Sequence, residues 1–409
     1  MTNALPGPPL RIAVLGDFDG IHTRRWLEVF VARGHDVHAI SYYRPRPDLP
    51  GVTLHVLSNA RRDGPLRLRS GHTAGPSAGG SSTASRSPAK RRLPPNLLRL
   101  VHAVRYQRAG LKRTLTAIVP DVFHAHYLVE HGFYGALAGF RPYVVSAWGS
   151  DLLVESRKPL GRLIARWTLR RVDLLTANDA SLARRAVALG LPEERVRVVH
   201  LGTDASFLDA GARSVNVSGA DAQPTLISDR ALEPLYNVDV VLRAFARLRE
   251  RLPAARLIVA NDGSQRRRLE ALAGDLGLGG SVDFRGYLAP SDLAAALAGA
   301  HVYVSVPGSD SLALSNLEAM AAGAFPVVAD LPSVDGWIDH GLSGLRVPPR
   351  DVDALADALF ASLADAGLRR RAAGLNRAKV EAQGLREPNM LVMERHYYRL
   401  AGHPISTSI

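Results

Sequence analysis

The chain has 409 residues, 46% of them hydrophobic and 22% charged, with 51 Lys and Arg against 38 Asp and Glu and a formal net charge of +13. This length suits two globular domains. Because there is no cysteine, a disulfide framework, a thiolate nucleophile and a cysteine-ligated metal are excluded. No stretch approaches the ~20 continuous apolar residues of a membrane-spanning helix, and the segment before Leu10 lacks the features of a signal peptide. We therefore expect a cytoplasmic protein.

The first half of the chain alternates strand-like and helix-like segments. The apolar run 10–17 predicts a buried parallel strand, 22–34 a helix and 35–41 a second strand. Residues 61–95 are rich in Gly, Ser, Pro and Arg, which predicts a disordered basic loop. A basic amphipathic helix is expected over 97–119. Further strand-like runs follow at 120–128, 141–151, 172–180 and 196–204. We expect an amino-terminal domain over 1–204.

The second half repeats this alternation after a segment without periodicity at 205–224, which we expect to be a linker. The strands and helices from 225 onward predict a second domain over 225–385, followed by a helix within 386–409 that packs back toward the first domain. The predicted fold class is therefore α/β, with two Rossmann-like β/α/β domains facing each other across a cleft.

The sequence SDSLALSNLEAMAAG, residues 309–323, places Asp310 and Glu318 on either side of a helix start. Ser315 and Glu318 fit a capping box, which would be a purely structural role. In a parallel sheet, however, ligands lie beyond the carboxyl ends of the strands, where helix amino termini favour anions. Carboxylates also accept hydrogen bonds from vicinal hydroxyls, so the pair suits a ligand that is part phosphate and part polyol, such as a nucleoside-diphosphate sugar.

The carboxylate, the seven-residue spacer, Glu318-Ala-Met-Ala-Ala-Gly and the following Pro-Val-Val strand together resemble the GT-B retaining glycosyltransferases of family 4, the glycosyl transferases group 1. The segments GDFDGIHTRRW, DVFHAHY and ANDGSQRRRLEALA resemble the first β-α turn, the histidine segment and the donor loop of that family. The resemblance implies transfer of a sugar from a nucleotide-diphosphate sugar to a hydroxyl acceptor. Both UDP- and GDP-sugars are candidate donors, and we favour UDP. The resemblance implies as well that no cofactor or metal is needed.

The resemblance also assigns site residues in the donor half of the cleft. Glu318 would bind the ribose and Asp310 the transferred sugar, while the backbone of the following residues and Arg230 would bind the sugar and diphosphate. The catalytic residues would be His126, Asp310 and Arg230. The donor-binding set would be Glu318, Asp310, Ser311, Leu312, Ala313, Leu314, Arg230, Asp262, Gly263 and Tyr287. The chain departs from the family in having Asp310 where glutamate is usual and Tyr236 where a lysine is usual.

The acceptor would bind mainly in the amino-terminal domain. The candidate residues are Asp17, Gly20, His22, Arg24, Arg25, His124, Trp148 and Asp151. Other interpretations, most of them purely structural, exist for several of the candidate site residues. His124 and His126 could form a zinc pair or lie in the core, and Asp17-Phe18-Asp19 could be a metal-binding Asp-x-Asp or only a turn. Trp148 could be a core aromatic, and Arg230 could bond backbone carbonyls.

Two other classes of function compete with this interpretation. The basic segment 61–92 could bind nucleic acid or an anionic membrane, although it lacks the interleaved aromatics that stack on bases. Peripheral contact with an anionic membrane is compatible with the enzyme, whose acceptor could be a small molecule, a saccharide or lipid-linked. The chain could alternatively be a nucleotide-sugar epimerase or binding protein on a similar scaffold. We expect no nucleic-acid partner.

Overall fold

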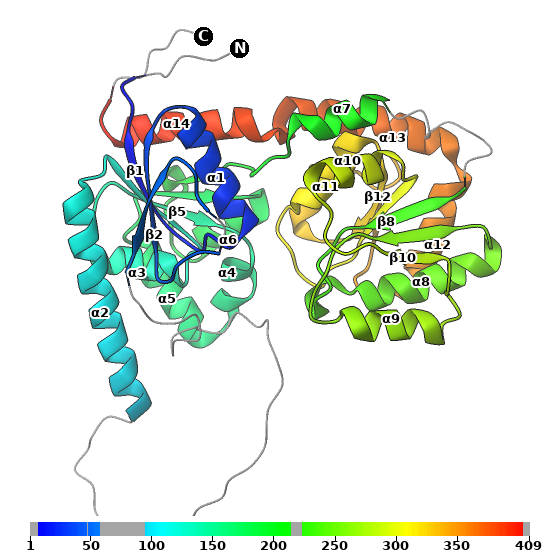
Figure 1. Cartoon of the computed structure of the whole chain (residues 1–409), viewed down its shortest axis with the longest axis horizontal. Coiled ribbons are helices and arrows are strands. Elements are labelled where there is room, and N and C mark those ends of the chain that lie inside the picture. Colours follow the sequence, from blue (N-terminus) through cyan, green and yellow to red (C-terminus); the bar gives the residue numbers. More distant parts are fainter. Residues whose placement is uncertain (1–6, 47, 58–94, 214–222, 404–409) are drawn as a thin grey trace, which may run out of the picture.

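The computed structural model describes residues 7–46, 48–57, 95–213 and 223–403, and only the backbone of residues 95–106. Two domains, each built on a parallel sheet, stand side by side, and this confirms the predicted fold class (Figure 1). The loop expected at 61–95 lies outside the described residues except for Pro95, which begins a helix. None of the described helices combines the length and apolar composition that crossing a bilayer requires.

In the described part of the amino-terminal domain, seven parallel strands have the order β3-β2-β1-β4-β5-β6-β7. Their central strands are almost wholly buried, because helices cover both faces of the sheet. The strands are β1 (Arg11–Leu15), β2 (Asp36–Ser41), β3 (Val52–Val56), β4 (Val122–His126), β5 (Tyr143–Ala147), β6 (Leu174–Ala177) and β7 (Val196–Val198). The helices are α1 (Ile21–Ala32), α2 (Pro95–Ile118), α3 (His131–Ala138), α4 (Ser150–Leu153), α5 (Pro159–Leu169) and α6 (Ala180–Ala188).

The carboxyl-terminal domain is also built on a parallel sheet, whose described strands have the order β10-β9-β8-β11-β12-β13. Its strands are β8 (Thr225–Ser228), β9 (Arg256–Val259), β10 (Val282–Phe284), β11 (Val302–Ser305), β12 (Phe325–Ala329) and β13 (Leu345–Val347). Its helices are α8 (Val238–Arg251), α9 (Arg266–Asp275), α10 (Pro290–Ala298), α11 (Leu314–Ala322), α12 (Val352–Ala364) and α13 (Ala366–Lys379).

The strand order reverses between β1 and β4 in the first sheet and between β8 and β11 in the second. At such a switch point the chains leaving two adjacent strands diverge, which opens a crevice at the carboxyl edge of the sheet. The loops after these strands therefore position the candidate site, which draws on both domains.

Two helices, α7 (Ala205–Arg213) and the final helix α14 (Arg386–Leu400), lie along the side of the molecule where the chain passes between the domains (Figure 1). The expected linker at 205–224 is not irregular throughout, because Ala205–Arg213 forms α7, which packs against α10 and α11. Phe207 anchors α7 by full burial in the core of the carboxyl-terminal domain, a tertiary contact that the small and polar composition of the segment does not reveal. Residues 214–222 lie outside the described residues.

The final helix, α14 (Arg386–Leu400), lies against α1 of the amino-terminal domain. Its Glu394 accepts hydrogen bonds from Arg33 at 2.5 and 2.7 Å and lies 2.8 Å from the ring nitrogen of His35. The hydroxyl of Tyr397 lies 2.5 Å from Nδ1 of His124. The chain thus returns to its first domain and closes the structure with buried polar contacts.

Candidate functional site

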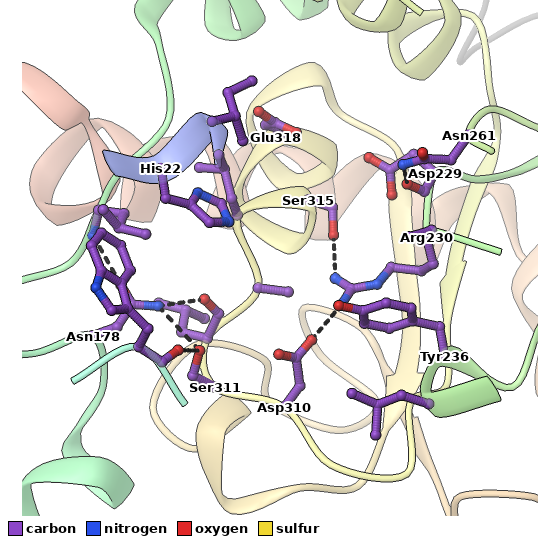
Figure 2. Close-up of a pocket in the computed structure, with 18 of the residues that line it drawn as sticks. His22, Asn178, Asp229, Arg230, Tyr236, Asn261, Asp310, Ser311, Ser315 and Glu318 are labelled. Atoms are coloured by element: carbon purple, nitrogen blue, oxygen red, sulfur yellow. Dashed lines mark hydrogen bonds and ion pairs between the residues drawn. The ribbon is translucent and has the colours of Figure 1, made fainter. Parts of the chain in front are cut away.

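A cavity of about 480 Å³ lies between the carboxyl edges of the two sheets (Figure 2). The carboxyl-terminal domain contributes the residues that follow β8, the loop after β11 and the first turns of α11. The amino-terminal domain contributes the start of α1 and the loops after β5 and β6. Both domains therefore shape one pocket at their switch points, where ligands of parallel α/β proteins bind.

Arg230 lies two residues beyond the end of β8 and is 9% exposed. Its guanidinium donates to Oδ2 of Asp310 at 2.5 Å and to Oγ of Ser315 at 2.8 Å, and it stacks over the ring of Tyr236 at 4.3 Å. Tyr236, at the position where the resemblance implied a lysine, thus supplies a platform for the arginine and no second positive charge. Arg230 is fixed beside the amino end of α11, where an anion would be stabilised.

The capping interpretation of Ser315 and Glu318 is wrong. Helix α11 begins at Leu314 with Ala313 as its cap residue, so Ser315 already lies inside the helix. The hydroxyl of Ser315 accepts from Arg230 and from the hydroxyl of Tyr303, both at 2.8 Å. Glu318 lies one turn further along the helix and lines the cavity.

Glu318 faces a guanidinium of the other domain, with Oε1 3.5 Å from Nη1 of Arg25. Burial and the nearby charge of Asp229 raise the pKa of Glu318 to about 7, although Arg25 opposes the shift. Burial also raises the pKa of Asp229 to about 6 against the opposing charge of Arg230. Oδ1 of Asp229 has no hydrogen-bond partner among the described residues. The cavity therefore holds two carboxyl groups that can bind polar ligand atoms.

The loop between β11 and α11 is held by the amino-terminal domain. The amide N–H of Leu312 donates to Oδ2 of Asp179 at 3.0 Å, and its carbonyl accepts from Nδ2 of Asn178 at 2.7 Å. The hydroxyl of Ser311 donates to the carbonyl of Trp148 at 2.8 Å. The Leu312 amide, predicted to bind the donor through its backbone, is thus engaged by the other domain.

The structure brings many of the predicted residues together in the cavity lining. These are His22, Arg25, Trp148, Arg230, Tyr287, Asp310, Ser311, Leu312, Ala313, Leu314 and Glu318. The other predicted residues do not line it. These are Asp17, Gly20, Arg24, His124, His126, Asp151, Asp262 and Gly263.

The two histidines of β4 are buried behind the cavity wall. His124 is enclosed by Tyr397 and by Ser146, whose hydroxyl lies 2.9 Å from Nε2. His126 packs edge-on against Trp148, at 5.0 Å between ring centroids. Burial lowers the pKa of His124 to about 3 and that of His126 well below its usual value, so both rings are neutral at pH 7. The catalytic role of His126 stays a prediction, and its side chain is screened from the pocket.

Four of the remaining residues shape loops. Asp151 accepts from the amides of Leu128, Gly149 and Leu152, at 2.9 to 3.0 Å, and so fixes the turn that presents Trp148. Asp17 accepts from the amide two residues on, at 2.9 Å, as in an Asx turn. Gly20 precedes the first residue of α1. Gly263 lies so close to Leu232 that an added Cβ would meet its carbonyl oxygen at 2.5 Å.

Several polar residues of the lining were not predicted from the sequence. They include Asn178, Asp229 and Asn261. Asn178 directly follows β6 and Asp229 directly follows β8, while Asn261 comes two residues after the end of β9. The rule that ligands gather at strand carboxyl ends would have found all three. Among the described residues, no group of three or more His, Cys, Asp or Glu side chains is arranged to hold a metal ion.

Comparison with known proteins identifies the family of the chain. The model of the family described as Glycosyl transferases group 1 matches residues 214–378, and that of the Glycosyl transferase 4-like domain matches 20–202. The D-inositol 3-phosphate glycosyltransferase of Nocardia farcinica is 30% identical over 274 residues, which are 61% of this chain and 60% of that protein. The lipopolysaccharide core biosynthesis glycosyltransferase LpsE of Rhizobium meliloti is 31% identical over 257 residues, which are 60% and 73% of the two chains.

Among solved structures, Anabaena Alr3699/HepE in complex with UDP superposes with a TM-score of 0.71 at 16% identity, over 96% of this chain and 100% of that one. The same protein with UDP-glucose gives 0.68, also at 16% identity, over 95% and 98%. Fold and site thus define a two-domain glycosyltransferase architecture. The chain belongs to the GT-B glycosyltransferases of family 4, the glycosyl transferases group 1.

Proposed function

We propose that this protein transfers a sugar from a UDP-sugar to a hydroxyl group of an acceptor, with retention of the anomeric configuration and without a metal ion. The observation that carries the proposal is the position of Arg230 beside the amino end of α11, with Glu318 one turn further along the same cavity wall. This arrangement suits a diphosphate joined to a ribose. UDP is favoured because Anabaena HepE, whose fold is similar, was solved with UDP and with UDP-glucose.

In this proposal the diphosphate lies at Arg230 and the amide groups that begin α11, and the ribose hydroxyls donate to Glu318. Asp310 faces the transferred sugar. Because Asp310 shares the guanidinium of Arg230 in this structure, at 2.5 Å, donor phosphate and Asp310 compete for the same charge. Two guanidinium groups, those of Arg25 and Arg230, then face the carboxyl groups of Asp229, Asp310 and Glu318.

The chemical step breaks the bond between the anomeric carbon and the diphosphate oxygen and forms a bond to the acceptor oxygen. The acceptor hydroxyl attacks on the face that the diphosphate leaves, and the departing phosphate takes its proton. Arg230 and the helix terminus stabilise the charge that develops on the leaving group. No protein nucleophile is required by this route.

Thermal-shift measurements with UDP, GDP and ADP test the donor site. We expect UDP to stabilise the parent most and Glu318→Ala to lose most of that gain, while Glu250→Ala on the exposed side of α8 keeps it. If Glu318→Ala responds to UDP as the parent does, the ribose assignment is wrong.

Product analysis tests the reaction itself. The anomeric configuration of the product by NMR distinguishes retention from inversion, and activity that survives EDTA supports the metal-independent route. An acceptor-free conversion of one nucleotide sugar into another would instead identify an epimerase.

A further inference from the structure

The face of α5 that points away from the core is strongly basic. Between residues 156 and 172 the chain carries six Lys and Arg side chains and no Asp or Glu. All six are exposed: Arg157, Lys158, Arg162, Arg166, Arg170 and Arg171. One of them, Lys158, pairs with Glu155 at 2.9 Å, so most of the positive charge of this face is uncompensated along its own segment. Such a face attracts an anionic partner.

The same face exposes two leucines. Leu160 is 58% and Leu163 66% exposed, and a spacing of three residues places them next to each other on the helix. The opposite side of α5 packs against the core of the domain, where Ala165, Thr168 and Leu169 are buried. Leucines placed among cations on an outward helix face are typical of helices that lie in a membrane interface.

A second cavity, of about 170 Å³, opens beside Leu160. It is lined by apolar groups of Val129, Leu160 and Ile164 and by the ring of Tyr127, and also by three charged residues, Glu130, Glu155 and Lys158. The hydroxyl of Tyr127 lies 3.1 Å from Oγ of Ser150, and Ser150 also lines the donor cavity. The α5 face, the second cavity and the donor site therefore follow one another across the amino-terminal domain.

Tyr127 itself adopts an uncommon backbone conformation, with φ at 78°. This left-handed region is costly for an aromatic residue and is retained mainly at sites of function. Here it places the Tyr127 ring at the boundary between the two cavities, directly after the end of β4.

We propose that α5 docks this protein on an anionic lipid bilayer and that the second cavity admits the polar head of a lipid-linked acceptor. Leu160 and Leu163 would enter the boundary between headgroups and acyl chains, while Arg162 and Arg166 would face lipid phosphates. A nucleic acid could pair with the cations, but it would leave both leucines in water. The proposal that a lipid-linked acceptor occupies the second cavity rests on the proposed transfer reaction. The proposal that α5 docks on a bilayer does not depend on that reaction.

Co-sedimentation with vesicles of phosphatidylcholine, with and without phosphatidylglycerol, tests the docking. We expect the parent to bind the anionic vesicles, and Leu160→Ser/Leu163→Ser to weaken that binding about tenfold, since two leucines lose their apolar contact. Arg162→Gln/Arg166→Gln should weaken it as well and reduce its dependence on salt. The matched control is Leu375→Ser on α13, whose leucine is 47% exposed on the other domain.

The UDP-induced thermal shift in each variant reports whether the fold and donor site are intact. If the leucine variant binds anionic vesicles as tightly as the parent does, or the parent does not bind them, the proposal is overturned. Salt-sensitive binding of RNA with no binding of vesicles would also overturn it, in favour of a nucleic-acid partner. If the variants lose vesicle binding while the parent shows no UDP shift, the docking holds and the donor proposal fails.

Discussion

Leu312 in the donor-side loop donates its amide N–H to Asp179 of the opposite domain at 3.0 Å. The other carboxylate oxygen of Asp179 accepts from the amides of Ser181 and Leu182 and so caps α6. One buried side chain thus joins the start of a helix in the amino-terminal domain to the loop that shapes the donor cavity. The position of that loop therefore depends on how the two domains close.

Asp179→Asn tests this connection. Asparagine is as good a helix cap as aspartate, so α6 is expected to remain formed. The amide group that replaces Oδ2 cannot accept from Leu312, and losing a hydrogen bond to a charged group costs about 1.5–3 kcal/mol. We expect UDP affinity, measured by calorimetry, to fall about tenfold or more. Asp351→Asn, at the cap of α12, is the control, and an equal loss in both variants would contradict the role of the loop.

Glu318→Gln tests the burial of the carboxylate. The pKa of Glu318 is raised from its usual 4.5 to about 7, so between these values the folded state keeps a proton that the unfolded state releases. The stability that this group contributes is full below pH 4.5 and is lost as pH rises through 7, by about 3 kcal/mol in total.

The glutamine variant removes this loss, because it has no charge to bury. We expect its melting temperature to exceed that of the parent at pH 8 and to match it at pH 4.5, as measured by calorimetry without nucleotide. A difference that is the same at both pH values would show that ionisation of Glu318 is not its cause.

Substitutions of Tyr236 test whether its ring holds the guanidinium of Arg230 in place for the donor. Removal of the ring in Tyr236→Ala frees the guanidinium, and a stacking contact of this kind contributes about 0.5–2 kcal/mol. We expect UDP binding to weaken about twofold to thirtyfold in the alanine variant and to change little in Tyr236→Phe, which keeps the ring. Should the phenylalanine variant lose as much affinity as the alanine variant, the hydroxyl rather than the stacked ring is what matters.

Gly263→Ala tests the loop after β9. The new Cβ would meet the backbone of Leu232 at 2.5 Å, so the two loops must separate. We expect a lower melting temperature in circular dichroism. Gly274→Ala in α9 has no atom within 4 Å of the added Cβ and should be neutral or stabilising by up to about 1 kcal/mol. Equal stability of the two variants would refute the close approach.

The sequence predicted the two-domain fold because buried parallel strands are short apolar runs and helices between them are periodic. It also predicted that Asp310 and Glu318 lie at one site, because both follow the end of a buried strand, and these inferences need only the local chain and the general geometry of parallel sheets. Arg230 was predicted from the family resemblance, and it lines the same cavity.

Tertiary contacts explain what the sequence could not give. Phe207 is one aromatic residue in a polar segment, yet it is fully buried and packs α7 against the core of the carboxyl-terminal domain. Asp151 resembles a surface carboxylate at a strand end, but three amides converge on it. Asp179, the hydrogen-bond partner of Leu312, is 133 residues away in the sequence. A local sequence pattern cannot predict such a contact.

A crystal structure of the complex with UDP tests the donor site. We expect ribose hydroxyls at about 2.7–3.2 Å from the carboxylate of Glu318 and a diphosphate against Arg230 and the first amides of α11. A nucleotide bound elsewhere, or a Glu318 carboxylate that contacts only Arg25, would contradict it.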